Sequence, residues 1–255
     1  MPHPEYSKIK GTLESIARKY PPEMVQHQLD DVERIAFHIQ LVINAKGTDV
    51  ALCDIGGGIG LFSVGCAALG MKVILMDDFR DEGNRQIAPA VLELHKSYGV
   101  EVSSRDAVGE GIDFPPGSLD VVTSFDSMEH WHHSPKRLFA AVRTALRPGG
   151  FFLLCGPNCV NLRKRISVPF GSGKWTGMNA WYETETFRGH VREPDVDDLR
   201  YIARDMRLRD VKVYGRNWLG YHSRKPLIRW ITRLTDRAIR LFPTLCSDIY
   251  MSGYV

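Results

Sequence analysis

The sequence predicts an α/β protein with a central, mostly parallel sheet that carries helices on both faces. Two observations lead to this fold class. Short apolar runs of strand length alternate with segments of helical periodicity, and the first run passes directly into a glycine-rich turn that opens a helix. Strands that alternate with helices form βαβ units, in which neighbouring strands run parallel. Seven runs are strand candidates, at residues 49–55, 72–78, 100–107, 119–126, 151–156, 210–215 and 247–255.

Two helices are expected before the first strand. Residues 6–20 and 23–46 have helical periodicity, and Pro21 and Pro22 separate them. We therefore expect residues 1–48 to form N-terminal helices that act as a cap. The main domain is then expected over residues 49–255.

Further helices are expected between the strands, at residues 61–70, 88–99, 135–150 and 193–206. Two of them end on residues that commonly terminate helices. The first closes on Gly70, and the third closes on the run Pro148-Gly149-Gly150. This order of strands and helices predicts one continuous α/β sheet.

The alternation of predicted strands and helices is interrupted twice, at about residues 159–190 and 216–245. Long stretches of this kind usually serve a function in a compact domain, so we expect both to form a helical or loop-like substrate cap. The first insert mixes basic and aromatic side chains, which could grip an anionic or sugar-bearing substrate. These side chains are Arg163, Lys164, Arg165, Phe170, Lys174, Trp175, Trp181, Tyr182 and Phe187.

Composition favours a globular protein of a reducing compartment. No run approaches the roughly 18 consecutive apolar residues of a membrane span, and the first residues lack the apolar core of a signal peptide. The five cysteines include no CxxC pair, which favours a reduced, cytoplasmic chain. Residues 159–245 hold 18 Lys and Arg against 9 Asp and Glu, whereas the remainder holds 15 against 21. The basic part could face an anionic substrate, a membrane surface or nucleic acid, or be an ordinary solvated surface.

Residues 223–245 have the pattern of a cationic amphipathic helix. Apolar side chains recur at helical spacing, and basic residues occupy other faces. Together with Trp230, such a helix could lie on a membrane or cover the substrate cleft. It could also pack on the domain with a solvated basic face. The apolar positions are Leu227, Ile231, Leu234, Ala238 and Leu241.

The glycine-rich turn at residues 54–60, "DIGGGIG", predicts a nucleoside cofactor. Glycines let the backbone adopt positive φ and approach a ligand closely. The second strand ends at Asp77, where a carboxylate can accept both hydroxyls of a ribose. Dinucleotide binding would require G-x-G-x-x-G spacing, and Asp54 would repel a pyrophosphate. A carboxylate at this place instead suits the amino group and sulfonium of S-adenosylmethionine.

Several motifs in the expected order resemble class I S-adenosylmethionine-dependent methyltransferases, especially the group that contains the ubiquinone-biosynthesis O-methyltransferases. "DIGGGIG" is similar to the first family motif and "VILMDD" (73–78) to the second. Residues 105–131 resemble the third and fourth motifs, and "ALRPGGFFLLCGPN" (145–158) resembles the stretch around the fifth strand. The resemblance implies a Rossmann-like domain with a seven-stranded sheet.

The resemblance also implies roles for residues of the first two motifs. Gly56, Gly58 and Gly60 would line the methionine part of the cofactor. Asp54 would lie near its amino group, directly or through water, and Asp77 would bind the ribose.

Residues of the later motifs would surround the adenine and the reacting end. Asp78 would lie near the adenine, and Asp106 and Ala107 would contact its ring. Phe125 would lie under the cofactor. Asp78 and Asp106 could instead serve only as loop or capping residues.

Candidate catalytic residues follow the fourth strand and the first insert. Glu129 and His130, in "DSMEHWHHS", and His190, in "FRGHVREP", could remove a proton from an acceptor hydroxyl. Asp126-x-x-Glu129-His130 is similar to the Glu-x-x-Glu-His arrangement that is linked with metal in ubiquinone-type O-methyltransferases. Because Asp replaces the first Glu, we do not expect a divalent metal. The alternatives are that Glu129 and His130 only order their loop, and that His190 caps the next helix.

The sequence therefore predicts an enzyme that uses S-adenosylmethionine and releases S-adenosylhomocysteine. The expected acceptor is a small molecule, glycosyl group or lipid-linked intermediate, methylated on oxygen, and peripheral membrane contact is left open. An RNA methyltransferase is the alternative within this class, although no RNA-binding appendage and no DNA-binding feature is recognisable. An NAD-dependent oxidoreductase and an inactive cofactor-binding scaffold are the alternatives outside it.

Overall fold

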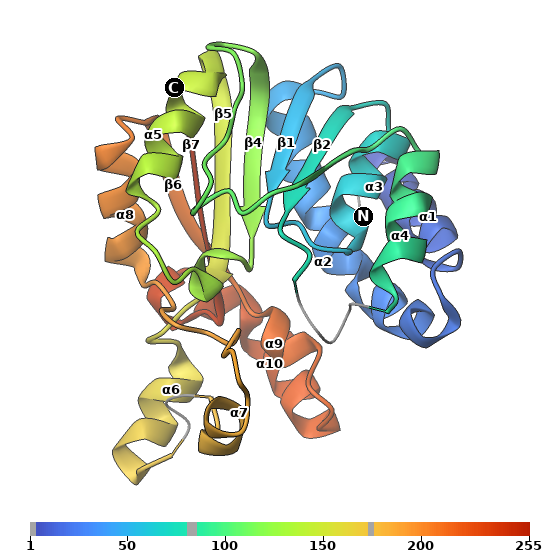
Figure 1. The fold of residues 1–255 in the computed structure, drawn as a ribbon. Coiled ribbons are helices and arrows are strands. Elements are labelled where there is room, and N and C mark those ends of the chain that lie inside the picture. The colour runs from blue at the N-terminus through green and yellow to red at the C-terminus, as the bar shows by residue number, and fades with distance from the viewer. Residues whose placement is uncertain (1–3, 81–85, 173–175) are drawn as a thin grey trace. The chain divides into compact units, whose positions relative to one another are not determined.

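A computed structural model describes residues 4–80, 86–172 and 176–255 of the chain. The predicted α/β class is confirmed, because the described strands form one seven-stranded sheet in the order β3-β2-β1-β4-β5-β7-β6 (Figure 1). β1 pairs in parallel with both β2 and β4, β2 pairs in parallel with β3, and β6 pairs antiparallel with β7. The strands are β1 (Ala51–Ile55), β2 (Lys72–Asp77), β3 (Glu101–Ser104), β4 (Leu119–Phe125), β5 (Leu146–Pro157), β6 (Arg209–Arg216) and β7 (Asp248–Tyr254).

The chain divides into two compact units that share strand β5. Unit 1 comprises the residues up to Ser124, Lys136–Phe152 and Val255. Unit 2 comprises Phe125–Pro135 and Leu153–Tyr254. The N-terminal helices belong to unit 1.

The helices of unit 1 are α1 (Pro4–Ala17), α2 (Pro22–Lys46), α3 (Leu61–Ala68), α4 (Ala88–Ser97) and α5 (Lys136–Ala145). Helices α1, α2 and α3 pack against one another. Gly65 of α3 makes this packing close: a Cβ atom there would lie 2.5 Å from Leu13 of α1 and 2.9 Å from Ile39 of α2. Leu13 and Ile39 are fully buried, so the N-terminal helices contribute part of the core.

The expected helix at 135–150 is shorter than predicted. Helix α5 ends at Ala145, and the next residues already belong to β5. Pro148 has no N–H to donate within a helix, while Gly149 adopts φ 76° and donates to the carbonyl oxygen of Val255 at 2.8 Å. The backbone of this stretch is therefore paired with the end of the chain, which the local sequence could not indicate.

The helices of unit 2 are α6 (Leu162–Ser167), α7 (Met178–Tyr182), α8 (Val196–Asp205), α9 (Trp218–Tyr221) and α10 (Pro226–Ile239), with 3-10 turns η2 (Met128–His130), η3 (Val168–Phe170) and η4 (Pro243–Leu245). Both predicted inserts thus contain helices, of which α10 is the longest described one at 14 residues. Helix α8 begins with a capping box formed by Asp195 and Asp198. Lys174 and Trp175 lie outside the described residues.

Within the described ranges, no helix combines the length and the apolar character that crossing a membrane requires.

Candidate functional site

The glycine-rich turn joins the end of β1 to the start of α3. Gly56 and Gly58 adopt φ angles of 69° and 57°, in the region that favours glycine. Gly60 is the N-cap residue of α3. Gly57, which sequence reasoning did not single out, is restricted by contact: a Cβ atom there would lie 2.1 Å from Oδ2 of Asp54. The turn therefore needs glycines for two different reasons.

Asp54 lies beneath this turn and is 1% exposed. Its Oδ2 accepts a hydrogen bond of 2.7 Å from the Ser63 hydroxyl, and its Oδ1 accepts one of 2.8 Å from the Thr123 hydroxyl. Burial raises the pKa of Asp54 to about 6, although both hydroxyl donors act in the opposite direction. The carboxyl group thereby ties β1 to α3 and to β4 while placing an acidic group against the turn.

Asp77 links the turn to the end of β2. Its Oδ2 accepts a hydrogen bond of 3.0 Å from the N–H of Gly58, and its Oδ1 accepts one of 2.8 Å from the N–H of Phe79. Phe79 has φ 49°, an uncommon conformation for a bulky residue. The carboxylate thus fixes the glycine turn by accepting two backbone hydrogen bonds.

Asp78 and Asp106 both organise the backbone that follows them. Oδ1 of Asp78 accepts from the N–H of Arg80 at 3.0 Å. Oδ1 of Asp106 accepts from the N–H groups of Val108 and Gly109 at 3.0 and 2.9 Å. The structure thus shows the turn-forming role that the sequence left as an alternative. Contact with adenine remains a prediction for both.

The third strand is shorter than predicted, and this shifts two expected site residues. Strand β3 ends at Ser104, so Asp106 and Ala107 lie in the turn beyond it rather than on the strand. Ala107 is buried. Its contact with adenine also remains a prediction.

Tyr20 connects the N-terminal helices to the glycine turn, a link that sequence reasoning missed. Its hydroxyl donates to the carbonyl oxygen of Gly60 at 3.0 Å and lies 3.0 Å from Nε2 of His95. Tyr20 and His95 are both buried, and burial lowers the pKa of His95 to about 4. A neutral His95 can donate its Nε2 proton to the tyrosine oxygen, which completes the chain of hydrogen bonds.

Unit 2 begins with a sharp turn after β4. Phe125 is half-buried at the end of that strand, and Asp126 follows with φ 48°. The N–H of Asp126 donates to the carbonyl oxygen of Cys155 on β5 at 3.1 Å. This turn directs the chain into η2, which carries two of the predicted catalytic residues.

All three predicted catalytic residues, Glu129, His130 and His190, come together in unit 2. One potential ligand atom from each lies within 4.8 Å of the others. The two imidazole rings meet edge to face, with centroids 4.9 Å apart. His190 thus joins the adjacent residues Glu129 and His130 in one cluster, although it lies 60 positions after His130 in the sequence.

Backbone hydrogen bonds hold the two halves of this cluster together. The carbonyl oxygen of Glu129 accepts from the N–H groups of Val191 and Arg192 at 2.6 and 3.2 Å. Nε2 of His132 lies 3.1 Å from the carbonyl oxygen of Phe187. The backbone of Glu129 therefore orders its loop, as one of the predicted alternatives states. Its side chain takes no part in these backbone hydrogen bonds. The other alternative, that His190 caps the next helix, is wrong because the Asp195 side chain makes that cap.

Both imidazoles are oriented through Nδ1. His130 Nδ1 lies 2.7 Å from the carbonyl oxygen of Arg188, and His190 Nδ1 lies 2.8 Å from Oε1 of Glu193. Because a carbonyl oxygen only accepts, Nδ1 of His130 carries the proton. In each neutral ring the Nε2 atom then keeps its lone pair, as a general base or a metal ligand requires.

Glu193 and Lys164 support His190. Glu193 was not predicted as a site residue, and Lys164 was expected only among the basic side chains that could grip a substrate. Lys164 from α6 bonds to Oε2 of Glu193, while Oε1 faces His190. Burial alone would raise the pKa of Glu193, but its contacts with His190 and Lys164 outweigh burial and lower it. An ionised Glu193 would stabilise a protonated His190.

Glu129 is 1% exposed. Burial, and next the nearby Asp126 carboxylate, raise its pKa to about 8. Oε2 of Glu129 has no hydrogen-bond partner among the described residues. A buried carboxyl oxygen without a hydrogen-bond partner costs folding free energy. A bound substrate group or cation would supply the missing interaction.

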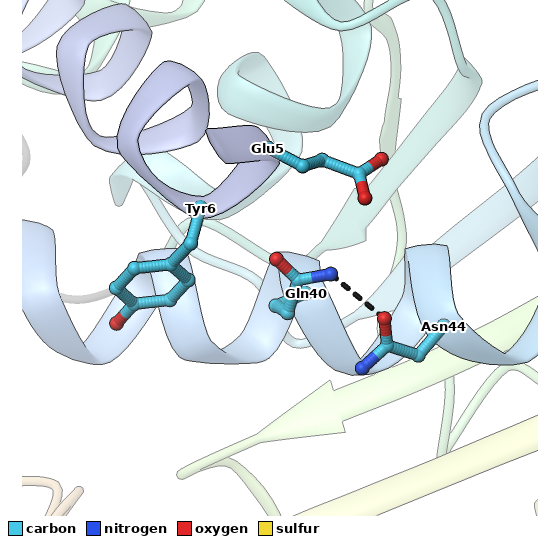
Figure 2. A pocket seen from close by; sticks show the side chains of 4 residues that line it. All are labelled: Glu5, Tyr6, Gln40 and Asn44. Atoms are coloured by element: carbon cyan, nitrogen blue, oxygen red, sulfur yellow. Dashed lines mark hydrogen bonds between the residues drawn. The ribbon is translucent and has the colours of Figure 1, made fainter. Parts of the chain in front are cut away.

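A separate hollow of about 330 Å³ lies between α1 and α2 (Figure 2). It is lined by Glu5, Tyr6, Gln40 and Asn44, and the amide of Gln40 donates to Asn44 across one helical turn. None of the predicted site residues, all of which are described, lines this hollow. We assign this hollow no role.

The residues that sequence reasoning missed had weak signals. Gly57 was visible as the middle glycine of the turn, but only the position of Asp54 shows why it must be glycine. Tyr20 contacts Gly60, which is 40 positions away in the sequence. Glu193 contacts His190, which is 3 positions away. Tyr20 carries no local motif, whereas the pair His190-x-x-Glu193 could have been noticed as an i, i+3 pair.

Comparison with known families gives one match over most of the chain. The family described as "Methyltransferase domain" matches residues 25–213. Among curated protein sequences, none matches this chain significantly.

Solved structures with the same fold include several methyltransferases. One is an S-adenosylmethionine-dependent methyltransferase from Archaeoglobus fulgidus, with 18% identity over 88% of this chain and 94% of that chain, at a TM-score of 0.57. Phosphoethanolamine N-methyltransferase 2 from Haemonchus contortus, in complex with S-adenosyl-L-methionine, has 18% identity over 86% and 52%, at a TM-score of 0.54. Geranyl diphosphate C-methyltransferase from Streptomyces coelicolor, in complex with Mg²⁺, has 18% identity over 91% and 78%, at a TM-score of 0.52.

Proposed function

The chain belongs to the methyltransferase-domain family and has the fold of S-adenosylmethionine-dependent methyltransferases, and from this premise we propose its reaction. It transfers a methyl group from S-adenosylmethionine to an oxygen atom of a small-molecule, glycosyl or lipid-linked acceptor. The observation that carries this proposal is the cluster of Glu129, His130 and His190, because an oxygen nucleophile gains most from a base that removes its proton.

The cofactor site is proposed on the glycine turn of unit 1. The acidic groups of Asp54 and Asp77 support an S-adenosylmethionine ligand, which is cationic, and disfavour a pyrophosphate. Asp77 is proposed to accept hydrogen bonds from the ribose hydroxyls. Asp54 contributes through its charge, or through water, because both its oxygen atoms already accept hydrogen bonds from hydroxyl groups.

The adenine and the methionine end are assigned to the remaining predicted residues. Asp106 and Ala107 are proposed to contact the adenine, with Asp78 nearby. Gly56, Gly58 and Gly60 are proposed to line the methionine part. Phe125 is proposed to lie under the cofactor.

The acceptor base is proposed to be an imidazole. His130 and His190 each present Nε2, and the ion pair of Glu193 with Lys164 stabilises the imidazolium that forms on His190. Glu129, with its pKa of about 8, would be largely protonated near neutral pH and would donate a hydrogen bond to the acceptor.

Similar structures include an N-methyltransferase of phosphoethanolamine and a C-methyltransferase of geranyl diphosphate. The fold therefore does not select oxygen, and the assignment depends on the base cluster. Both of those named substrates carry phosphate groups. The basic residues of the first insert, such as Arg163 and Arg165, support an anionic acceptor for this chain as well.

A divalent cation held by the same cluster is the second candidate. Ligand atoms of Glu129, His130 and His190 lie within 4.8 Å of one another, and Oε2 of Glu129 lacks a partner. Two imidazoles and a carboxylate suit several divalent metals. A cation would supply Lewis acidity toward the acceptor oxygen, and the hydrogen bonds at Nδ1 would orient both imidazoles for it.

Calorimetric titration with S-adenosylhomocysteine, with NADH in parallel, tests the cofactor. Micromolar binding of the first and none of the second is expected; binding of NADH alone would move the protein to the oxidoreductases. Methyl transfer to candidate acceptors is then compared for the wild type, His190→Gln and the control His133→Gln. We expect His190→Gln to reduce kcat by a factor of about 10²–10⁴ while S-adenosylhomocysteine affinity stays unchanged.

A chelator separates the two roles of the cluster. Activity that survives EDTA supports the proton-accepting role. Activity that is lost and then restored by added Mg²⁺ or Zn²⁺ supports the cation site instead.

A further inference from the structure

The apolar side chains along one face of helix α10 are exposed. Leu227, Trp230 and Leu234 are 65%, 61% and 69% exposed. Ile231 and Ala238, on the same face, are exposed as well. These are the positions at helical spacing that would form the buried face if the helix packed on a core. The amphipathic pattern is thus turned outward.

The inner face of the same helix is polar. Asp236 is 5% exposed and accepts hydrogen bonds from the Asn217 amide at 2.8 Å and from Nε of Arg240 at 3.0 Å. Thr232 faces Gly220 of α9, where a Cβ atom would lie 2.3 Å from its hydroxyl oxygen. The helix is therefore fixed to unit 2 by polar contacts, and its outward apolar face takes no part in this packing.

The charges around this face are all positive. Asp236 is the sole acidic residue of the segment 223–245, and it is buried and paired with Arg240. Exposed Arg224, Lys225, Arg233 and Arg237 accompany the apolar side chains. The solvent-facing side of α10 therefore combines apolar and cationic groups without an exposed acid.

Helices α6 and α7 carry a second exposed apolar group. Exposed Arg163 and Arg165 lie on α6, whereas exposed Glu183 and Glu185 follow α7. Figure 1 shows both helices and α10 at the same end of unit 2. Arg165 of α6 donates to the carbonyl oxygen of Thr244 at 3.2 Å, so α6 is joined to the segment that follows α10. The exposed apolar side chains of this part of unit 2 are Ile166, Val168, Phe170, Met178, Trp181, Tyr182, Leu241 and Phe242.

We propose that these two groups of exposed side chains, on α10 and on α6–α7 with Leu241 and Phe242, bind the surface of an anionic lipid bilayer. Apolar and aromatic side chains would enter the interface between headgroups and acyl chains, with Trp230 and Trp181 at its boundary. Lys and Arg side chains at the edge would pair with anionic headgroups. The protein would lie on the membrane without crossing it.

Charge favours a bilayer over a second copy of the chain. A symmetric contact through α10 would place the same surface of two chains together. Arg233 and Arg237 would then face a partner surface that also offers only cations from this segment. Anionic headgroups complement these cations, whereas a second copy repels them.

Vesicle flotation with the purified full chain tests this proposal. Vesicles of phosphatidylcholine alone are compared with vesicles that contain about one third phosphatidylserine. We expect binding to the second kind, with loss at high salt. Leu234→Gln and Trp230→Gln should each weaken binding several-fold, whereas the control Tyr201→Gln, at an exposed aromatic residue of α8, should not.

The cations are tested in the same way. Arg233→Gln and Arg237→Gln should each weaken binding about five-fold, the effect of one basic residue at an anionic surface. Arg204→Gln, on α8, is the matched control. Circular dichroism confirms that each variant is folded.

Two results would overturn the proposal. One is the absence of binding of the folded wild type to either vesicle. The other is equal binding by wild type and Leu234→Gln. If light scattering instead shows a dimer that Leu234→Gln dissociates, with no vesicle binding, the face is an interface between copies. None of these measurements depends on methyl transfer, so failure here would leave the proposed reaction untouched.

Discussion

The hydroxyl group of Tyr20 donates a hydrogen bond of 3.0 Å to the carbonyl oxygen of Gly60. Tyr20 stands at the end of the first N-terminal helical segment, and Gly60 is the N-cap residue of α3. The bond therefore connects the N-terminal helices to the turn that is proposed to hold the cofactor. His95 of α4 joins the same tyrosine oxygen at 3.0 Å, which makes Tyr20 the centre of a buried polar group.

Tyr20→Phe should lower both stability and cofactor affinity. The substitution leaves the Gly60 carbonyl oxygen and Nε2 of His95 without their partner in a buried place, at a cost of about 1–3 kcal/mol. Urea unfolding measures the stability, and S-adenosylhomocysteine titration measures the affinity. Tyr98→Phe is the control, because Tyr98 accepts only a solvent-exposed hydrogen bond from Lys19. An affinity equal to wild type would show that the N-terminal helices do not position the turn.

Asp77→Ala should weaken binding of S-adenosylhomocysteine by about 1–3 kcal/mol, the scale of losing hydrogen bonds to a charged group. The carboxylate also accepts the N–H of Gly58, so part of the loss would come from a less ordered turn. Asp49→Ala is the control, since exposed Asp49 precedes β1 at the opposite end of the strand. Unchanged affinity of the Asp77 variant would contradict the assigned role.

Glu129 should make the protein less stable at high pH. The pKa of its carboxyl group is about 8 in the folded state, against an ordinary value of 4.5. The folded protein therefore holds this proton more tightly than the unfolded chain does. The resulting stabilisation is full below pH 4.5 and is lost as the pH rises toward 8.

Thermal unfolding of wild type and Glu129→Gln at several pH values tests the predicted direction of this pH dependence. The glutamine side chain of the variant cannot ionise. The Tm of Glu129→Gln should therefore rise relative to that of the wild type as the pH increases from 5 to 9. Glu183→Gln, at an exposed glutamate, should show no such trend. If added Zn²⁺ or Mg²⁺ raises the Tm of the wild type but not that of Glu129→Gln, the second candidate for this cluster gains support.

The fold was predictable because it rests on local and repeated signals. The strand runs around Leu52, Leu75 and Val121 are apolar because both faces of the sheet are covered, and these side chains are fully buried. The prediction erred where distant backbone decides the structure. Residues 146–150 join a strand through hydrogen bonds with Val255, a pairing that no local pattern reveals.

The candidate site was predictable in composition but not in contacts. The sequence pattern named Asp54 and Asp77 as candidates and, separately, Glu129 with His130 and His190. That the last three residues lie together is shown only by the structure. The sequence pattern could not show that Ser63 and Thr123 bind the carboxylate of Asp54, because those contacts arise only when β1, α3 and β4 come together. The orientation of α10 was equally hidden. Its periodicity marks an apolar face, but which side packs on the protein depends on Asn217 and Gly220.

Gly57→Ala should be more disruptive than Gly58→Ala, although only Gly58 of the two has a positive φ, of 57°. A Cβ atom at Gly57 would lie 2.1 Å from Oδ2 of Asp54, whereas one at Gly58 meets nothing within 4 Å. Asp54 cannot move away without breaking its bonds to Ser63 and Thr123. We expect a loss of up to about 3 kcal/mol for overpacking at Gly57 and of about 1–2 kcal/mol for the strained backbone at Gly58.

A double-mutant cycle identifies the contact responsible. Asp54→Ala removes the carboxylate that the added Cβ would meet, so Gly57→Ala should cost less in that background than in the wild type. Gly58→Ala should cost the same in both backgrounds, because its strain comes from its own φ angle. Urea unfolding of the six proteins gives the energies. Additive losses for Gly57→Ala and Asp54→Ala would show that the contact between these residues does not set the shape of the turn.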